Sequence, residues 1–438
     1  MSKIIILGGG WTGVSAALEF KARFPSVDIL VIESSLYSKR GGLLRSEVVQ
    51  NHIFDVGGSH IIFSRNSEVL SKILALLGGN LIKNTRKSFI LFNGIFVPYP
   101  FENGLYMLPT EDRADALISF LEAWMSRSPK WEPKTLKEWI YGFFGKWIAE
   151  KYLVPYNEKI WSKPLDQLDA DWVYTPGRLP IADWKAIVKS SIGIPTIGYV
   201  EQSIFYYPRK GGIQALYDAA LEKAMSTGVD FLWSERVTTV KNDGGEWLIN
   251  DRYRGDLLIS TIPLPELVKV TEAPEEVIKA IDSLDYNSVA VVGFALNKPA
   301  PDQHWIYVPQ KDLVFHRYAW ISNYSPYNAP KGQSTLIAEV SIPKGKMPSP
   351  RLTEEVLNGL EKIGILEKRN IISAIIWFNK YGYPIYTIGH RNVREIIQNW
   401  LKETGIYSLG RWGAWHYWNI DKIYEEVIKL VDKVPLPK

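Results

Sequence analysis

The chain has 438 residues, of which 51 are Lys or Arg and 47 are Asp or Glu, giving a formal net charge of +4 at pH 7. About two or three domains fit this length, and a small charge spread along the chain does not favour a nucleic-acid partner. There is no cysteine, which excludes disulfides, thiolate nucleophiles and iron–sulfur clusters. No run reaches the ~18 apolar residues of a membrane helix, so we expect a soluble, cytoplasmic protein without a membrane span.

The chain opens with a predicted strand, helix and second strand. Residues 3–7 form an apolar, β-branched run that ends in glycine, and residues 12–24 carry apolar side chains at helical spacing until Pro25. Residues 29–32 form the second apolar run. This order predicts a βαβ unit and therefore a parallel sheet.

The sequence pattern from residue 111 to about 190 predicts helices. Residues 135–138, Thr-Leu-Lys-Glu, predict a capping box at the start of one helix. The helix before it has one apolar face, formed by Ala114, Leu117, Ile118, Leu121, Trp124 and Met125. We expect a helical insertion domain here.

The second half of the chain returns to the first sheet and then becomes strand-like. An amphipathic helix is predicted over 213–225, followed by a strand over 257–261 that rejoins the first sheet. A mostly antiparallel sheet is predicted from the runs 289–296, 316–321, 335–341 and 371–378. One more helix begins at about Asp421.

A glycine-rich turn follows the first strand. Gly8, Gly10 and Gly13 satisfy G-x-G-x-x-G, and Glu33 ends the second strand about 20 residues later. The glycines admit a pyrophosphate at the helix N-terminus, and the carboxylate can accept both ribose hydroxyls. The pattern therefore predicts a dinucleotide site, against the alternative of a glycine-rich turn with a surface Glu.

Two more glycine turns follow within the first 60 residues. They are Gly41-Gly42-Leu43-Leu44-Arg45-Ser46 and Phe54-Asp55-Val56-Gly57-Gly58-Ser59-His60. A plain NAD-binding fold has no need of them. In this order the turns resemble the FAD-binding half of the flavoprotein group that contains amine oxidases, protoporphyrinogen oxidase and UDP-galactopyranose mutase.

Later segments resemble UDP-galactopyranose mutase, the eukaryotic type more than the bacterial one. The matching segments fall in the family's order at 97–103, 155–161, 207–212, 305–309, 317–325, 381–384 and 410–417. The resemblance implies a reaction without net redox change that interconverts UDP-galactopyranose and UDP-galactofuranose. In that family the N5 atom of reduced FAD attacks the anomeric carbon. A reductant is then needed, which is either NAD(P)H bound in the substrate cleft, with Arg86 as a weak match to an arginine of that site, or an external electron donor.

The resemblance implies FAD contacts in all three turns and near the C-terminus. The first set is Gly8, Gly10, Trp11, Thr12, Gly13 and Glu33. The second set is Gly42, Leu43, Arg45, Gly58, Ser59 and His60. The last set is Val237, Gly410, Arg411, Tyr417 and Asn419. His60 matches a catalytic histidine against the flavin ring, although a lone His after glycines is otherwise a loop residue.

The resemblance also implies a UDP-sugar site. Arg178 and Arg317 match two catalytic, diphosphate-clamping arginines, with Arg178 in a segment of altered spacing. Phosphate-binding tyrosines are matched by Tyr307, Tyr324, Tyr383 and Tyr417, each of which could otherwise be a strand aromatic. The uridine pocket is matched by Tyr99, Phe101, Asn157 and Trp161. Two positions depart from the pattern: Glu102 replaces a Gln at uracil and Gln202 an Asn near the sugar, which puts the base or the sugar in doubt.

Two other functions remain open from the residues. One is an FAD-dependent oxidoreductase of the amine oxidase or protoporphyrinogen oxidase type, whose pocket should be mostly hydrophobic. The other is an FAD-binding scaffold without activity. An anion clamp of arginines and tyrosines favours the isomerase over both.

We therefore expect an α/β protein with a Rossmann-like FAD-binding domain, a helical insertion domain and a mostly antiparallel β-sheet domain. The predicted boundaries are 1–80, 205–262 and 385–438 for the FAD-binding domain, 110–204 for the insertion domain, and 81–109 and 263–384 for the sheet domain. We expect a small-molecule substrate and no metal.

Overall fold

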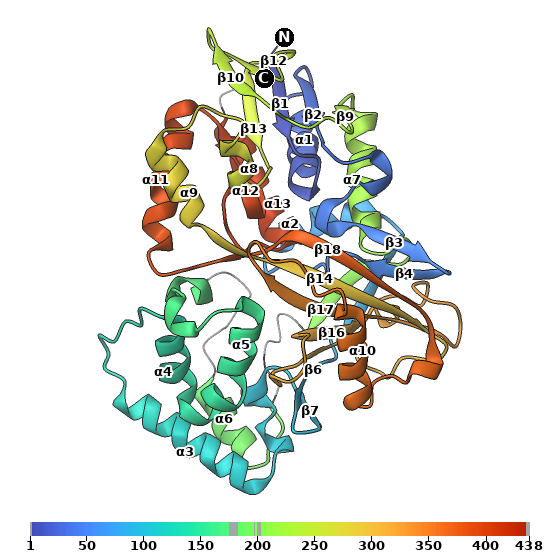
Figure 1. The fold of residues 1–438 in the computed structure, drawn as a ribbon, viewed down its shortest axis with the longest axis vertical. Helices are drawn as coiled ribbons and strands as arrows, with labels where there is room; N and C mark the ends of the chain where they lie inside the picture. Colours follow the sequence, from blue (N-terminus) through green and yellow to red (C-terminus); the bar gives the residue numbers. More distant parts are fainter. Residues whose placement is uncertain (1, 175–182, 197, 199–202, 435–438) are drawn as a thin grey trace.

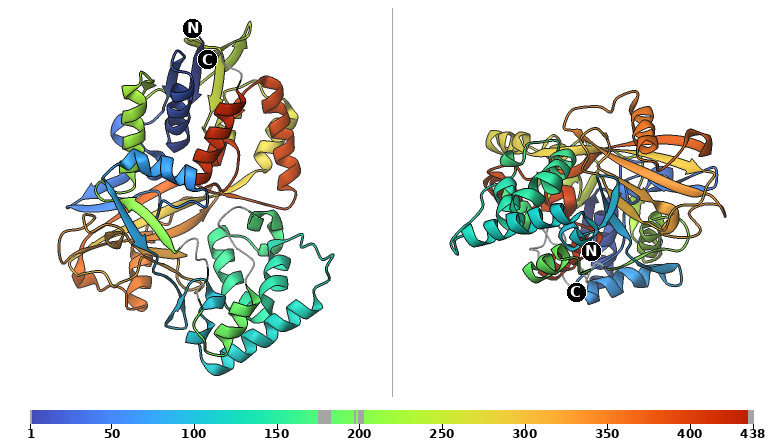
Figure 2. Two further views of the ribbon diagram at one scale, coloured as in Figure 1. Left: turned by 180° about the vertical axis from the view of Figure 1, so that it is seen from behind. Right: turned by 90° about the horizontal axis from the view of Figure 1, so that it is seen from below.

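A computed structural model of the chain describes residues 2–174, 183–196, 198 and 203–434. The molecule is elongated, with both termini at one end of its long axis and a helical lobe at the other (Figures 1 and 2). The predicted fold class is confirmed: a Rossmann-like sheet, a helical region and a large mostly antiparallel sheet are present.

The Rossmann-like part is a five-stranded parallel sheet near the termini. Its strands, in spatial order, are β19 (Tyr407–Ser408), β13 (Leu257–Ser260), β1 (Lys3–Leu7), β2 (Asp28–Ile32) and β9 (Asp230–Leu232). One face is covered by α1 (Trp11–Arg23), α7 (Gln214–Ser226) and α13 (Ile420–Lys433). The predicted return of residues 257–261 to the first sheet is confirmed, because β13 pairs with β1 in parallel.

Smaller elements pack around this sheet. An antiparallel three-stranded sheet contains β10 (Val240–Asp243), β11 (Glu246–Ile249) and β12 (Tyr253–Gly255). The helices α8 (Leu264–Val268), α9 (Glu275–Ser283) and α11 (His390–Thr404) lie on the side away from α1. The short helix α12 (Gly410–Gly413) begins against Thr12 of α1. Two antiparallel strand pairs and one helix lie beside the large sheet. The pairs are β3 (Ser46–Val49) with β4 (His52–Asp55) and β5 (Leu81–Thr85) with β8 (Ile204–Pro208), and the helix is α2 (Ser67–Leu77).

The large sheet has seven strands and is antiparallel except where β15 pairs with β6. In spatial order its strands are β18 (Ile371–Ile385), β14 (Asp285–Leu296), β17 (Ser334–Pro343), β16 (Arg317–Trp320), β15 (Trp305–Tyr307), β6 (Ser88–Phe92) and β7 (Ile95–Pro98). Helix α10 (Leu352–Lys362) covers one face with apolar side chains.

Strand β18 is longer than the sequence predicts. The apolar run ends at Phe378 and the next residues look like a turn, yet the strand continues to Ile385 because β14 pairs with it along nearly its whole length. Gly382 makes this approach fit: a Cβ there would lie 2.4 Å from the Val289 side chain.

The helical lobe is formed by α3 (Thr110–Ser126), α4 (Leu136–Ile148), α5 (Val154–Trp161) and α6 (Trp184–Ser191). The predicted capping box is present at the start of α4, where Thr135 Oγ1 accepts the Glu138 N–H and Glu138 accepts the Thr135 N–H.

The apolar face of α3 is not the face that the helix buries. An apolar stripe normally faces the core, but the buried residues of α3 are Ala116 and Phe120. Ile118, Leu121, Trp124 and Met125 of the predicted face are exposed. The helix buries its opposite side because Phe120 packs towards the core of the lobe, which leaves the longer stripe at the outer surface.

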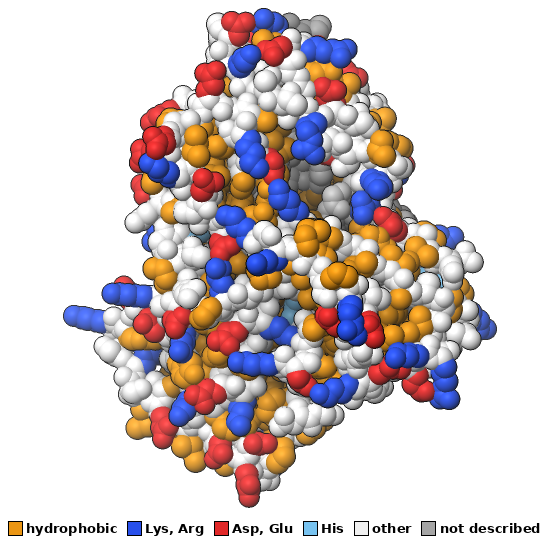
Figure 3. All heavy atoms as spheres, in the orientation of Figure 1, with side chains coloured by type: hydrophobic (Ala, Val, Ile, Leu, Met, Phe, Trp, Pro, Cys, Tyr) orange, Lys and Arg blue, Asp and Glu red, His pale blue; other side chains and the backbone are white. Residues whose placement is uncertain are grey.

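The surface carries Lys and Arg side chains interspersed with Asp and Glu (Figure 3). Among the described residues, no helix is long and apolar enough to cross a membrane.

Candidate active site

One cavity lies between the glycine turns, the large sheet and the helical lobe. It is lined by thirteen residues predicted for the site: Ser59, His60, Tyr99, Phe101, Glu102, Asn157, Trp161, Tyr307, Arg317, Tyr383, Arg411, Tyr417 and Asn419. These residues are scattered from the third glycine turn to the start of α13. The fold therefore brings most of the predicted substrate residues to one place.

The glycine turns form a continuous cradle beside this cavity. A Cβ at Gly13 would lie 1.9 Å from the Gly8 carbonyl oxygen, so only glycine allows this turn to close on α1. The second turn lies over the first, since the Gly42 Cβ position is 3.9 Å from Gly10 Cα. At the C-terminal end, Gly410 (φ +88°) packs against Thr12.

The cradle fits a dinucleotide such as FAD. Gly10 is the N-cap of α1, no side chain caps the helix, and no atom lies within 4 Å of the Gly10 Cβ position. The free N–H groups of a helix N-terminus next to open space suit a pyrophosphate. Residues of the three turns and of 410–419 would hold the cofactor.

Glu33 lies at the end of β2, and Val237 lies in the loop that follows the neighbouring strand β9. Glu33 Oε2 accepts the Gly9 N–H at 2.6 Å and Oε1 accepts the Ser35 N–H at 2.7 Å. The Glu235 N–H donates to the Glu33 carbonyl at 2.9 Å, which holds the loop of Val237 beside this carboxylate. The arrangement places Glu33 next to the first glycine turn, where a ribose contact is predicted.

Three other predicted cofactor residues have side chains already engaged or only partly accessible. The Trp11 ring is buried and its Nε1–H donates to the Ile420 carbonyl at 3.1 Å, so its backbone alone can face the turn. Arg45 pairs with Glu47 at 3.2 Å, while its buried Nε lacks a partner among the described residues. Leu43 is half-buried, and its carbonyl is 2.1 Å from the Gly57 Cβ position.

Replacing Gly10 by alanine is expected to weaken FAD binding about tenfold without changing the apo-fold. The added methyl enters the space of the cradle and touches no protein atom. FAD titration followed by flavin fluorescence measures the loss, and the melting temperature of the apo-protein serves as control. Gly13→Ala should instead destabilise the apo-protein, because its Cβ meets the backbone of Gly8. Equal FAD affinity in Gly10→Ala and wild type would contradict the assignment of the cradle.

Arg317 is fixed at the cavity by Glu339. The two residues are directly paired across β16 and β17. Arg317 donates from Nε and Nη2 to the two carboxylate oxygens at 2.9 and 2.6 Å, and Glu339 is fully buried. Glu339 also accepts the Ser59 N–H at 2.9 Å and the Tyr383 hydroxyl at 3.2 Å. One carboxylate thus ties the third glycine turn to the arginine and a tyrosine.

This ion pair keeps Arg317 charged and oriented. Burial alone would lower the pKa of Arg317, but the adjacent Glu339 outweighs it and raises the pKa. For Glu339, burial alone would raise the pKa, and Arg317 outweighs it in the opposite direction. Among the described residues, Arg317 Nη1 has no protein partner, so N–H groups remain for an anion in the cavity.

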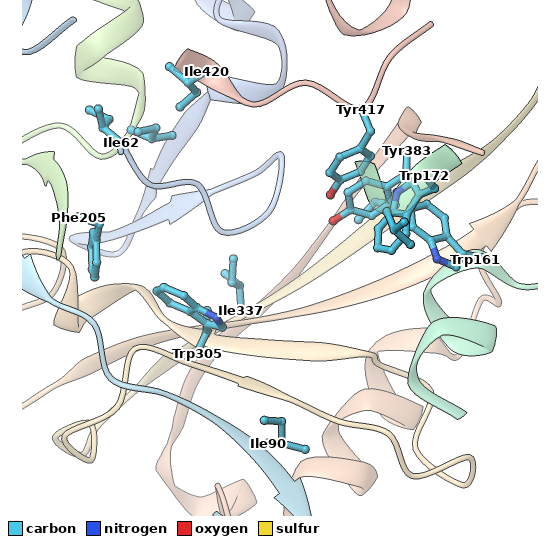
Figure 4. Close-up of a cluster of buried hydrophobic side chains, with 14 of the residues drawn as sticks. Ile62, Ile90, Trp161, Trp172, Phe205, Trp305, Ile337, Tyr383, Tyr417 and Ile420 are labelled. Atoms are coloured by element: carbon cyan, nitrogen blue, oxygen red, sulfur yellow. The ribbon is translucent and has the colours of Figure 1, made fainter. Parts of the chain in front are cut away.

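Tyr383 and Tyr417 are stacked side by side, with ring centroids 5.2 Å apart. Trp161 meets both rings edge-on at 6.2 and 6.1 Å, and Figure 4 shows this group with Trp172 beside it. Burial raises the pKa of the Tyr383 hydroxyl. Both tyrosines therefore line the cavity as part of a rigid aromatic wall, and the Tyr383 hydroxyl is neutral there.

A second aromatic wall lies across the cavity. Tyr307 packs against Tyr99 at 4.9 Å and against Tyr156 at 5.4 Å. The Arg86 guanidinium lies over the Tyr99 ring at 4.4 Å and the Trp305 ring at 5.3 Å. This wall thus combines flat rings with a cation.

The residues matched to a uridine pocket form a mostly aromatic part of the cavity wall, which we call the aromatic slot and which contains Glu102. Phe101 is fully buried and stacks on Tyr152 at 4.9 Å. Asn157 accepts the Trp161 Nε1–H and donates to the Leu153 carbonyl. Burial raises the pKa of Glu102 to about 7, and no cation pairs with this carboxyl among the described residues. A flat apolar slot with two polar groups suits a planar heterocycle.

His60 is neutral. Its Nδ1 lies 2.9 Å from the Gly58 carbonyl, which only accepts hydrogen bonds, so Nδ1 carries the proton and Nε2 is an acceptor. Burial, with a contribution from Arg411, lowers the pKa of His60 to about 4. Arg411 itself donates to the carbonyls of Trp418 and Gly382 and so bridges β18 and the C-terminal turn. Asn419 lines the cavity at this turn.

Among the described residues, one predicted substrate residue does not line the cavity. Tyr324 is fully buried behind it, and its hydroxyl lies 2.5 Å from Ser59 Oγ. It can support the third glycine turn, but a ligand in the cavity would not reach it. Arg178 and Gln202 lie outside the described residues.

Sequence reasoning missed Glu339, which holds Arg317, and several residues that line the cavity. Glu339 is the one charged residue in the apolar run 335–341, which is a signal for a buried partner. Tyr156, Trp305 and Gly382 lie in segments noted for their resemblance but were given no role. Tyr152 and Phe144 carry no signal, because each sits in an ordinary helical apolar pattern. No group of His, Asp or Glu that could hold a metal ion is found in the described part of the chain.

Comparisons with known proteins agree with this geometry. The family model of flavin containing amine oxidoreductases matches residues 184–418, and that of the NAD(P)-binding Rossmann-like domain matches residues 6–77. The structure of reduced UDP-galactopyranose mutase is similar over 99% of this chain and 95% of that one, with 28% identity and a TM-score of 0.90.

Other solved structures share the fold. A putative protoporphyrinogen oxidase from Exiguobacterium is 18% identical over 98% of both chains, with a TM-score of 0.73. A fatty acid isomerase from P. acnes that produces CLA is 15% identical over 99% of both chains, with a TM-score of 0.65. The family match covers more than half of the chain and includes five of the seven strands of the large sheet and the turn at 410–417. The chain therefore belongs to the flavin-containing amine oxidoreductase family and is a flavin-dependent enzyme.

Proposed function

We propose that the protein is an FAD-dependent UDP-galactopyranose mutase, an isomerase that interconverts UDP-galactopyranose and UDP-galactofuranose without net redox change. The similarity to a UDP-galactopyranose mutase over nearly the whole of both chains supports this function. The observation that carries it is the position of Arg317, which is held by a buried carboxylate at a cavity wall next to the cofactor cradle.

The reaction expels and recaptures a diphosphate. Negative charge develops on the leaving oxygen, and preoriented guanidinium and hydroxyl groups stabilise such charge best where water is excluded. Arg317 would donate to the diphosphate from the N–H groups that Glu339 leaves free. Tyr307 and Tyr417 would donate hydroxyl hydrogen bonds to the diphosphate, while Arg86 and Arg411 add positive charge at the wall. The Tyr383 hydroxyl already donates to Glu339 and would help to hold that carboxylate in place.

The remaining residues would orient the ends of the substrate. The slot of Phe101, Glu102 and Tyr152 would take the uracil ring, which places the sugar between the tyrosines and the glycine turns. When bound and reduced, FAD supplies the nucleophile for the anomeric carbon. Neutral His60 would offer its Nε2 lone pair to the flavin edge or to a sugar hydroxyl without adding charge.

An anaerobic assay tests the proposal. The purified FAD-loaded protein is reduced with dithionite, UDP-galactofuranose is added, and UDP-galactopyranose is followed by chromatography. We expect conversion that depends on prior reduction and consumes no oxidant. The oxidised protein is the matched control and should be inactive. Absence of conversion, together with unchanged flavin fluorescence on adding UDP, would contradict the proposal.

A second function is an oxidoreductase that acts by hydride transfer on an apolar or amine substrate. It is favoured by the amine oxidoreductase family match and by the many aromatic side chains of the cavity. In such an enzyme the substrate would reduce the flavin, and each turnover would need one equivalent of an oxidant to reoxidise it. Stoichiometric bleaching of oxidised flavin by an amine, with no effect of UDP, would select this function.

A further inference from the structure

Helix α5 is the helix of the lobe that packs against the large sheet (Figure 1). It carries Asn157 and Trp161, which line the cavity. Its neighbour on the sheet is the loop of residues 308–316, which joins β15 to β16. The residues that flank this loop, Tyr307 and Arg317, also line the cavity. The spacing between α5 and the loop therefore sets how far apart these parts of the cavity wall lie.

One side chain of α5 fastens the helix to this loop. Lys159 Nζ donates to the Val308 carbonyl at 3.0 Å and to the Gln310 carbonyl at 2.7 Å. Its ammonium lies 6.0 Å from the centre of the Phe315 ring. Burial lowers the pKa of Lys159 to about 7, so this ammonium is largely withdrawn from water. The two hydrogen bonds to carbonyl groups compensate for the lost hydration.

The loop is the firmer of the two partners. At its base the Val308 N–H donates to the His316 carbonyl at 2.9 Å, and Gln310 Nε2 donates to the Leu91 carbonyl of β6 at 2.8 Å. Leu313 is buried in the core beneath α10. Helix α5 has only eight residues, and so short a helix depends on tertiary contacts for its position. The loop therefore holds α5 rather than the reverse.

A cavity residue contacts the same loop from the same face of α5. Tyr156 precedes Lys159 by three residues, which places both side chains on one side of the helix. The Tyr156 ring meets the Tyr307 ring edge-on at 5.4 Å and the His316 ring at 6.5 Å. Tyr156 lines the cavity and Lys159 does not. The lysine can therefore act on a ligand only through the geometry of the wall.

We propose that Lys159 is a positioning residue that holds α5 against the loop 308–316 and so fixes the spacing of the cavity walls. The proposal rests on the proposed function for the identity of its test ligand, UDP. Substrate and transition state contact the same two walls, so a change in spacing should weaken the binding of both alike. Arg317 keeps its orientation, because Glu339 holds it independently. The expected signature is a raised KM with little change in kcat.

The test uses the full-length, FAD-loaded protein at pH 6, where the Lys159 ammonium is charged. Lys159→Met keeps an unbranched side chain but removes the donors. In this variant the Kd for UDP and the KM of the reduced enzyme for UDP-galactofuranose should rise about tenfold, with kcat within about twofold of wild type. Lys159→Arg retains N–H donors and should recover part of the affinity. Hydrogen–deuterium exchange of the amides of 149–161 in the ligand-free protein should be faster in Lys159→Met.

Lys163→Met is the matched control. Lys163 follows α5 and pairs with Asp285 of β14 at 2.8 Å, so this change also removes a contact with the large sheet. A partly exposed ion pair contributes little, so KM and amide exchange should match wild type.

Unchanged UDP affinity or unchanged amide exchange in Lys159→Met would overturn the proposal. So would equal effects of Lys159→Met and Lys163→Met, or a fall in kcat without a rise in KM. The melting temperature and flavin content of each variant are recorded to show that it is folded. A wild-type protein that binds no UDP would refute the proposed function, and amide exchange alone would then decide whether Lys159 holds α5.

Discussion

Arg317→Ala is expected to lower turnover of UDP-galactofuranose about 100- to 1,000-fold while FAD remains bound. The substitution removes preoriented N–H donors at the place where negative charge develops on the diphosphate. Removing one such donor group from an active site typically lowers turnover by this factor. The glycine cradle does not include the Arg317 side chain, so the yellow colour of the holoprotein should persist. Steady-state kinetics with the reduced enzyme measure the loss of turnover, and the flavin-to-protein ratio measures whether FAD remains bound.

The variant must be separated from an effect on folding. Removing Arg317 leaves Glu339 buried without its cation, which typically costs about 3–5 kcal/mol of stability. The double variant Arg317→Ala with Glu339→Gln removes that stranded charge and provides the control. Arg317→Lys keeps the charge but loses the two-pronged contact, and should fall between wild type and alanine. Unchanged turnover in a fully flavin-loaded Arg317→Ala protein would refute the role of this residue.

Glu102→Gln is expected to stabilise the protein in alkaline solution by roughly 3 kcal/mol relative to its effect in acid. The ordinary pKa of a glutamate is 4.5, and burial raises that of Glu102 to about 7. The folded state therefore holds this proton while the unfolded state loses it. Wild-type stability falls as the pH rises from about 4.5 to 7, and the full penalty is present above pH 7. Glutamine does not ionise, so the variant escapes the penalty.

Urea unfolding of both proteins at pH 5 and pH 9 measures this difference. Glu266→Gln is the opposite control, because Lys380 and Tyr381 outweigh burial and lower the pKa of Glu266 to about 2. That substitution should cost more stability above pH 4.5 than below it. UDP binding gives a second readout under the proposed function. Wild type should lose UDP affinity above pH 7, where the carboxyl can no longer donate, and Glu102→Gln should not. Parallel pH profiles of the two proteins would show that Glu102 stays ionised.

Local patterns were sufficient for the cofactor half of the molecule. The first strand, its glycine turn and the helix after it are neighbours in sequence, and their conformation follows from residue type: Gly13 closes on the backbone of Gly8, and Pro25 lies just beyond the end of α1. The capping box of Thr135 and Glu138 is equally local. Such features can be predicted because few distant contacts compete with them.

The substrate side depends on contacts between distant segments, and there the sequence had less to offer. Glu339 is one residue in an apolar run until the register of β16 and β17 sets it opposite Arg317. Tyr324 and Tyr383 look alike as strand aromatics, yet packing buries the first behind Ser59 and leaves the second at the cavity. Neither outcome can be read from periodicity, because a pattern shows which residues share a face and not what that face meets.

The sequence by itself determined the parallel βαβ unit, the three glycine turns, the flavoprotein fold class and thirteen of the residues that line the cavity. Only the tertiary structure decided the end of β18, the partner of Arg317, the uncharged surroundings that raise the pKa of Glu102, and the outward face of α3. The physical reason is the sequence separation over which each interaction acts. Turn geometry and helix or strand preference act over a few residues, whereas burial, strand register and ion pairing depend on segments up to hundreds of residues away, as with the Ser59 N–H and Glu339.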